Sequence, residues 1–351
     1  MRVQGSRVPP GINAVAPVQA LRYDGAALWA IDQTRLPGET TELELHDAEA
    51  VAAAIRRLAI RGAPLIGVAA GYGVALALAR DPDGLDTAAS LLTDARPTAA
   101  NLGHAVRRVA AAARRADRRD AAAAALAEAR SLHAEETAAS AAMGVHGADL
   151  LAGARRVLTH CNTGALAAPG RGTALAAIYE LHARGGLEHV LVCETRPLLQ
   201  GARLTAWELG RAGIVHALIV DGAAAGLIAA GEVDAVLVGC DRVAANGDVA
   251  NKVGTYAHAL AAAATGIPFV VIGPTTTIDP GCDDGSAIVI EQRDPAEVSS
   301  VAGQILTPAG TSCRNPAFDV TPARLITALV TERGVAAPPD RASVAALLAR
   351  A

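Results

Sequence analysis

Residues 156–161 read RVLTHC, residues 172–186 read GTALAAIYELHARGG, and residues 189–194 read HVLVCE. The outer two segments are short apolar runs, which predict buried strands, and the middle one has helical length and ends at glycines. The same alternation continues through three further apolar runs, VHALIV near residue 215, AVLVGC near residue 235 and PFVVIG near residue 268. Strands that alternate with helices predict a parallel sheet covered on both faces. We therefore expect an α/β fold with a Rossmann-like, doubly wound C-terminal domain.

The first half of the chain has a different pattern. Residues 27–45, ALWAIDQTRLPGETTELEL, predict two short strands around a Pro-Gly turn. Helical patterns follow, and the last of them is an Ala-rich helix from about Asp120 to Gly144 or slightly beyond. We expect a smaller N-terminal domain of short strands and helices over residues 1–148 and the Rossmann-like domain over residues 149–351.

Composition excludes several classes of function. The net charge is -4, and only 2% of residues are aromatic, so the chain lacks the basic, aromatic surface of a nucleic-acid-binding protein. Residues 62–79 carry no charge over a length that could span a membrane, but four glycines and a proline there favour a buried helix. Five cysteines without a CxxC pair fit a reducing cytoplasm. We expect a cytoplasmic protein that binds neither nucleic acid nor membrane.

Polar residues follow four successive predicted strands. In open parallel sheets, ligands bind outside the carboxyl ends of the strands. The residues at those ends are His160, Cys161 and Asn162 after the first, Cys193, Glu194, Thr195 and Arg196 after the second, Asp221 after the third, and Cys240, Asp241 and Arg242 after the fourth. A turn alone does not need so many titratable groups, so this edge of the sheet is the predicted site.

The segment GCDRVAANGDVANKVGTY, residues 239–256, contains the strongest candidate. Asp241 could cap a turn, pair with Arg242 or act in chemistry. Asp248 suits the N-cap of a helix that begins near Val249, which would place Asn251 and Lys252 in the first helical turn. Because a helix dipole disfavours lysine there, this pattern indicates an anionic ligand nearby.

Cys161 has three interpretations. A nucleophile needs a neighbouring base, but His160 faces the opposite side of a strand. His160, Cys161 and Cys240 lack a recognisable metal-ligand spacing, so no metal is expected. A buried structural thiol is the usual role of a cysteine. The position of Cys161 at the end of a strand favours a catalytic role as much as that structural one. The other cysteines suit packing.

Two arginines precede helical patterns. Arg61 lies in IRGAP, where Gly62 permits close backbone approach, and Arg96 lies in ARPTAANLG. Both could be ordinary surface charges. Their places at helix entrances favour phosphate binding.

Six segments together resemble the methylthioribose-1-phosphate isomerase family. They are IRGAPLIGVAAGYG, RPTAANL, LTHCNTGALA, CETRPLLQGARLTAWEL, GCDRVAANGDVANKVGTY and NPAFDVTPARLITALVTERG. The wider superfamily includes ribose-1,5-bisphosphate isomerases and the regulatory subunits of the translation initiation exchange factor. The presence of both Cys161 and Asp241 in intact motifs favours the enzymes over the non-catalytic subunits.

The resemblance implies an aldose–ketose isomerisation that converts 5-methylthioribose 1-phosphate into 5-methylthioribulose 1-phosphate in methionine salvage, with neither metal nor organic cofactor, in a homodimer. It implies Asp241 as the general acid and Cys161 as an aid to hydrogen transfer. The substrate contacts that it implies are Arg61, Gly62, Ala63, Arg96, Gln200, Asn251 and Lys252.

Three residues depart from the family pattern. Gly103 and His104 replace bulky aromatic residues, and Arg171 stands where an uncharged residue is usual. If these side chains line the pocket for the 5-substituent, they favour a polar or anionic group there. The alternative is that Arg171 points to solvent and His104 packs in the interior. The alternatives to 5-methylthioribose 1-phosphate are 5-deoxyribose 1-phosphate and ribose 1,5-bisphosphate, and a phosphosugar or nucleotide sensor is the rival from another class.

Overall fold

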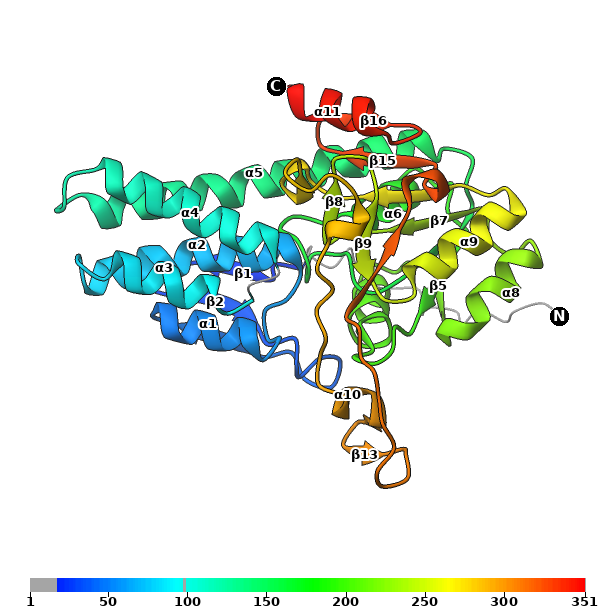
Figure 1. The fold of residues 1–351 in the computed structure, drawn as a ribbon, viewed down its shortest axis with the longest axis horizontal. Helices are drawn as coiled ribbons and strands as arrows, with labels where there is room; N and C mark the ends of the chain where they lie inside the picture. The colour runs from blue at the N-terminus through cyan, green and yellow to red at the C-terminus, as the bar shows by residue number, and fades with distance from the viewer. Residues whose placement is uncertain (1–17, 97–98, 351) are drawn as a thin grey trace.

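The computed structural model describes residues 18–96 and 99–350 of the 351-residue chain. The C-terminal half is built on a sheet with the strand order β16-β15-β10-β7-β4-β5-β6, in which only the β15–β16 pair is antiparallel (Figure 1). Its strands are β4 (Arg156–Thr159), β5 (His189–Cys193), β6 (His216–Ile219), β7 (Ala235–Val238), β10 (Phe269–Ile272), β15 (Ala328–Thr331) and β16 (Gly334–Ala336). The five strands predicted from apolar runs are β4, β5, β6, β7 and β10.

The strand order is that of a doubly wound sheet. From β6 to β15, the parallel strands stand in the order 3-2-1-4-5-6 when numbered along the chain. Alternate residues of each strand face opposite layers, so Val157 and Leu237 pack towards α5 and α6, while Leu158 and Val236 pack towards α8, α9 and α11. The covering helices are α6 (Ala174–Ala183), α7 (Ala206–Arg211), α8 (Ala224–Ala229), α9 (Thr255–Thr265) and α11 (Arg341–Ala349). The predicted α/β, Rossmann-like fold is confirmed.

The N-terminal half joins a small antiparallel sheet to a group of helices. The sheet is β1-β2-β3, of which β2 and β3 are the two predicted strands around the Pro-Gly turn. The sequence analysis did not predict β1 or α3. The elements are β1 (Leu21–Tyr23), β2 (Leu28–Ile31), β3 (Glu42–Leu45), α1 (Ala48–Arg56), α2 (Ala63–Arg80), α3 (Leu85–Thr93), α4 (Ala100–Arg115) and α5 (Ala121–Leu150).

The uncharged helix α2 lies at the centre of these helices. It is long and apolar enough to cross a membrane by length and composition, but 78% of it is buried inside the protein. Its neighbours are α1, α3, α4 and α5. The helix is therefore a core element, as its glycines and proline predict.

The 30-residue helix α5 connects the two halves (Figure 1). Ala125 and Leu132 in its first part pack in the N-terminal core, whereas Met143 and Ala148 pack against the large sheet. The predicted boundary at residues 148 and 149 falls at the end of this helix, which contributes to both cores.

A second, four-stranded sheet corrects one prediction. Its order is β11-β8-β9-β14, and β9 occupies the residues that the sequence predicts as the start of a helix. Asp248 does not cap a helix, because its carboxylate accepts hydrogen bonds from the backbone N–H groups of Gly285 and Ala323 at 3.0 and 2.8 Å. The strands are β8 (Arg242–Ala244), β9 (Val249–Lys252), β11 (Ile278–Asp279) and β14 (Phe318–Thr321).

An arm projects from the body between β11 and β14 (Figure 1). It contains α10 (Ala296–Ser299) and the short hairpin of β12 (Ser300–Val301) and β13 (Gln304–Ile305). The base of this arm, around residues 288–293, reaches the cavity described below.

Candidate active site

The site lies where the order of the large sheet reverses. β4 and β7 are neighbours in the sheet, and the chain leaves them in opposite directions, which makes their carboxyl ends the topological switch point. Cys161 follows β4 and Asp241 follows β7, and both line one cavity of about 280 Å³. Residues from the N-terminal half form the opposite wall of this cavity.

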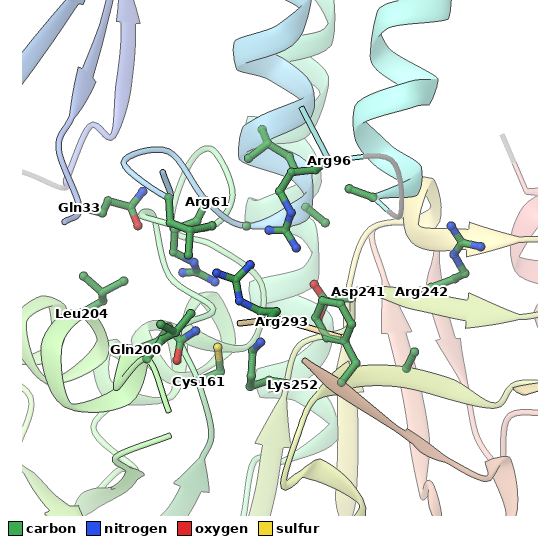
Figure 2. A pocket seen from close by; sticks show the side chains of 18 of the residues that line it. Gln33, Arg61, Arg96, Cys161, Gln200, Leu204, Asp241, Arg242, Lys252 and Arg293 are labelled. Carbon is green, nitrogen blue, oxygen red and sulfur yellow. The ribbon is translucent and has the colours of Figure 1, made fainter. Parts of the chain in front are cut away.

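Eight of the nine predicted site residues line this cavity (Figure 2). They are Arg61, Gly62, Ala63, Arg96, Cys161, Gln200, Asp241 and Lys252. Asn251 does not line it: its side chain is buried on the other side of β9, where the amide nitrogen donates to Thr255 Oγ1 at 3.0 Å. Because successive strand residues face opposite ways, β9 presents Ala250 and Lys252 to the cavity.

The backbone at Cys161 is held in a left-handed conformation with φ at 62°. Its N–H donates to Thr195 Oγ1 at 2.8 Å, and its carbonyl accepts from Thr205 Oγ1 at 2.6 Å. Non-glycine residues rarely adopt this conformation, and such strain is concentrated at functional sites. The thiol is 6% exposed and is directed into the cavity.

Asp241 is anchored by its backbone N–H, which donates to Ala250 O at 2.9 Å. Burial raises the pKa of its carboxyl, and the positive charges of Lys252, Arg96 and Arg61 oppose that rise. A carboxyl group with a raised pKa can hold a proton closer to neutrality than an ordinary aspartate. The group can therefore act as a general acid.

Lys252 stands between the thiol and the carboxyl in Figure 2. Its ammonium donates to Ala317 O at 2.9 Å and lies 4.7 Å from the centre of the Phe318 ring. Burial lowers its pKa, and the nearby Cys161 and Asp241 oppose that change. Lys252 reaches the cavity from a strand, so the helix-dipole argument does not explain its position.

Arg61 and Gly62 lie in the turn before α2. Arg61 Nη1 donates to Asn162 Oδ1 at 2.6 Å, and Nη2 donates to Asn162 O at 3.2 Å. Gly62 has φ at 93°, and a Cβ atom there would lie much closer to Ala167 O than van der Waals contact allows. Only glycine can bring this turn so close to the loop that follows Cys161.

Arg96 precedes α4 and faces the same space. Its guanidinium pairs with Glu291 at 2.7 Å, and Arg293 pairs with the same carboxylate at 3.1 Å. Gln200 is 7% exposed, and its side-chain oxygen has no hydrogen-bond partner in the described structure. Gln200 therefore carries an unsatisfied buried acceptor at the lining of the cavity.

Several lining residues are not predicted from the sequence. In the described lining, seven cationic side chains surround the single carboxyl of Asp241. Three of these cations, Arg57, Arg203 and Arg293, were not predicted, whereas Arg242 was among the strand-end residues of the predicted site. The motif GARLTAWEL contains Arg203 and was the signal that could have identified it, whereas Arg293 belongs to the arm and resembles a surface charge in sequence.

Polar groups after β5 and β6 serve the backbone instead. Asp221 accepts hydrogen bonds from the N–H groups of Thr195 and Arg196 at 2.8 and 2.7 Å. It thereby ties the ends of two neighbouring strands, and it does not line the cavity.

The three departures from the family pattern also lie outside the cavity lining. Arg171 pairs with Glu180 at 3.2 Å, and His104 is exposed on α4 next to Gly103. Partial desolvation of the ring, together with the positive charges of Arg107 and Arg108, lowers the pKa of His104.

One buried cluster has ligand types that zinc uses, namely His160, Cys193 and His258. His160 Nε2 lies 2.9 Å from Val253 O, and its Nδ1 lies 3.1 Å from His258 Nε2. Burial lowers the pKa of His160 to about 4 and that of His258 to about 3, so both rings are neutral at pH 7. Three donors are one fewer than a structural zinc site needs, and hydrogen bonds already join the rings. The cluster packs behind Cys161 and does not line the cavity.

Comparison with known proteins agrees with this geometry. Residues 59–338 match the Initiation factor 2 subunit family. The chain is 52% identical over 328 residues to methylthioribose-1-phosphate isomerase of Parasynechococcus marenigrum, covering 93% of this chain and 97% of that protein. It is 48% identical over 344 residues to 5-deoxyribose 1-phosphate isomerase of Moorella thermoacetica, covering 95% and 98%.

Solved structures lead to the same family. A crystal structure of 5-methylthioribose 1-phosphate isomerase from Pyrococcus horikoshii has a TM-score of 0.88 and 37% sequence identity, with 99% of each chain covered. The resemblance found in the sequence motifs is confirmed. The chain belongs to the Initiation factor 2 subunit family and, within it, to the sugar 1-phosphate isomerases related to methylthioribose-1-phosphate isomerase.

Proposed function

We propose that this protein converts 5-methylthioribose 1-phosphate into 5-methylthioribulose 1-phosphate, a step of methionine salvage. The observation that carries the proposal is a thiol, Cys161, and a carboxyl with a raised pKa, Asp241, in one cavity at the topological switch point. The activities named for the relatives from Parasynechococcus and Pyrococcus support the choice of substrate.

The cationic lining suits the phosphate group. In the described part of the chain, Arg61, Arg203 and Lys252 line the cavity without forming an ion pair. Arginine offers a planar, bidentate donor pair to phosphate, and a buried lysine offers a point charge. A bound phosphate dianion would supply the negative charge that these groups lack.

Asp241 would supply the acid that the reaction needs. A 1-phosphate blocks the anomeric oxygen, so the sugar ring cannot open as it does in a free aldose. Ring opening requires a proton on the ring oxygen, and hydrogen must then pass from C2 to C1 while the C2 hydroxyl becomes a ketone. The proton that leaves the C2 oxygen balances the proton that the ring oxygen gains, so the acid is regenerated.

Cys161 would assist the transfer of hydrogen between C2 and C1. Two routes are open: removal of a proton from C2 through an enediol, or a hydride shift from C2 to C1. Turnover in deuterated water separates them, because an enediol route incorporates solvent deuterium at C1 and a hydride shift does not.

A second candidate substrate is 5-deoxyribose 1-phosphate, which the relative from Moorella favours. The apolar side chains of Leu58, Leu198 and Leu204 in the lining suit either uncharged group at C5. Arg171 does not line the cavity and gives no support for ribose 1,5-bisphosphate. Competition among the three sugars, read as kcat/KM, identifies the preferred substrate. The same assay tests the rival class of function, because a non-catalytic sensor would bind a phosphosugar and leave it unchanged.

We also infer a cytoplasmic homodimer that works without metal or organic cofactor. The free cysteines fit a reducing compartment. Leu218 and Val220, at the edge strand β6, are 50% and 60% exposed, which suits contact with a second copy. Light scattering tests the dimer, and activity after treatment with a chelator tests the absence of a metal requirement.

A further inference from the structure

Glu208 in α7 is a buried acidic residue outside the cavity. Its side chain is 1% exposed, and it does not line the cavity. A charged group is rarely buried in this way unless hydrogen bonds satisfy it. The partners of this carboxylate therefore indicate what it does.

Three donors to the Glu208 carboxylate lie in the loop that follows Cys161, and the Tyr179 hydroxyl group of α6 is a further hydrogen-bond partner. Oε1 accepts from Asn162 Nδ2 at 2.7 Å, and Oε2 accepts from the backbone N–H of Ala165 at 2.8 Å. The N–H of Leu166 is a further donor to this carboxylate. Burial raises the pKa of this carboxyl, and the hydrogen bonds that both oxygens accept oppose that rise because they favour the ionised form.

The loop has a glycine where the carboxylate approaches it. A Cβ atom at Gly164 would collide with both oxygens of Glu208. Any larger residue at 164 would force the carboxylate away from the N–H groups that it accepts. The close contact therefore depends on both residues.

Asn162 links Glu208 to the cavity through its hydrogen bonds. Because its amide nitrogen donates to Glu208, its Oδ1 is turned towards Arg61, which donates to it at 2.6 Å. If the amide were reversed, its NH₂ group would face the guanidinium, donor against donor. Thr205, one turn before Glu208 in the same segment, donates to Cys161 O at 2.6 Å.

We propose that Glu208 is a positioning residue for the isomerase site: it fixes the amide of Asn162, through it the guanidinium of Arg61, and the loop that carries Cys161. This role rests on the proposed function, because it matters only if Arg61 and Cys161 act on a substrate. Glu208 touches no substrate.

The test is Glu208→Gln, which keeps the shape and replaces one acceptor by an NH₂ group. That group brings a donor to the place of an oxygen that accepts from Asn162 or from the N–H of Ala165, and the Tyr179 hydroxyl is the neighbouring group that can accept from it. We expect kcat/KM to fall by at least about tenfold, with most of the loss in KM because Arg61 is displaced. Glu180→Gln, which alters a partly exposed carboxylate on α6, is the matched control and should leave kcat/KM unchanged.

A second substitution separates positioning from folding. In Asn162→Asp alone, two buried carboxylates face each other, and we expect activity to fall. In the double variant Asn162→Asp/Glu208→Gln, the NH₂ group introduced at position 208 donates to the carboxylate introduced at position 162, which still accepts from Arg61. The double variant should recover kcat/KM to within about threefold of wild type, which a merely structural role does not predict.

Two outcomes overturn the proposal. One is a Glu208→Gln protein with kcat/KM within twofold of wild type. The other is a folded double variant that is no more active than either single variant. If wild type shows no turnover at all, the proposed function fails instead, and the same variants are compared by calorimetry for affinity towards inorganic phosphate. The same pattern of loss and recovery is then expected, and equal affinity in all variants overturns the positioning role.

Discussion

Replacement of Asp241 by asparagine removes the transferable proton and little else. The amide has nearly the same size, and the backbone N–H at 241 still donates to Ala250 O at 2.9 Å. A positioned general acid contributes about 10²–10⁴ in rate. We therefore expect kcat to fall by that factor, which corresponds to about 3–5 kcal/mol in the activation barrier. Ligand affinity should stay the same or rise, because Lys252, Arg96 and Arg61 lose a competing carboxyl.

The assay pairs turnover with binding. Ketose formation gives kcat, and calorimetry with the ketose product gives the dissociation constant. Asp283→Asn is the control, because Asp283 is exposed and pairs only with Arg341 in the described structure. Wild-type kcat should decline as the pH rises through the raised pKa of Asp241, since the protonated form is the active one, and Asp241→Asn should lack that decline. A kcat for Asp241→Asn within threefold of wild type would refute the assignment of the acid.

Three further results are expected. Gly62→Ala should destabilise the protein by about 2–5 kcal/mol, because residue 62 has a positive φ and an alanine Cβ would collide with Ala167 O. A loss of unfolding free energy below about 1 kcal/mol, measured by urea unfolding, would contradict this. Cys161→Ala should lose most of the activity and keep phosphate affinity, and full activity would remove the thiol from the mechanism. Glu136 is 6% exposed, and burial raises its pKa from 4.5 to about 7. Its stabilising contribution is therefore present below pH 4.5 and lost as the pH rises through about 7. Glu136→Gln should remove up to about 3 kcal/mol of that pH dependence, and identical unfolding profiles for variant and wild type at pH 5 and pH 8 would contradict it.

The sequence predicts the large sheet well because its signals are local. Helical patterns bound each of the apolar runs that form β4, β5, β6, β7 and β10. Parallel strands that are buried on both faces are continuous apolar runs without alternating polar residues, so they are easy to recognise in the sequence. Cys161 and Asp241 could be identified because both directly follow such strands.

The second sheet could not be predicted in this way. β9 is four residues long and pairs with β14 near residue 320, so the contacts that make it a strand come from a distant part of the chain. Asp248, which precedes β9, is a residue type that often caps a helix, and for this reason the predicted helix beginning near Val249 was wrong. Lys252, which the resemblance implies as a substrate contact, nevertheless lines the cavity.

Several arginines escaped prediction for a similar reason. Arg293 reaches the cavity because it lies at the base of the arm, where the chain leaves the body after β11, and no local pattern of residue types or spacing indicates this position. Arg203 is directed by the backbone carbonyls of Gln33 and Leu36, to which it donates at 2.7 and 3.1 Å. These contacts join the two halves of the protein and have no local pattern.

The most direct test of the account mixes purified wild-type protein with 5-methylthioribose 1-phosphate and follows the sugar by phosphorus NMR. The Cys161→Ala/Asp241→Asn double variant, run at the same concentration, is the reference. The account predicts complete approach to equilibrium with the ketose 1-phosphate for wild type and no detectable ketose for the double variant, although calorimetry shows that both bind the sugar. A wild-type protein that binds 5-methylthioribose 1-phosphate and leaves it unchanged would contradict the central claim.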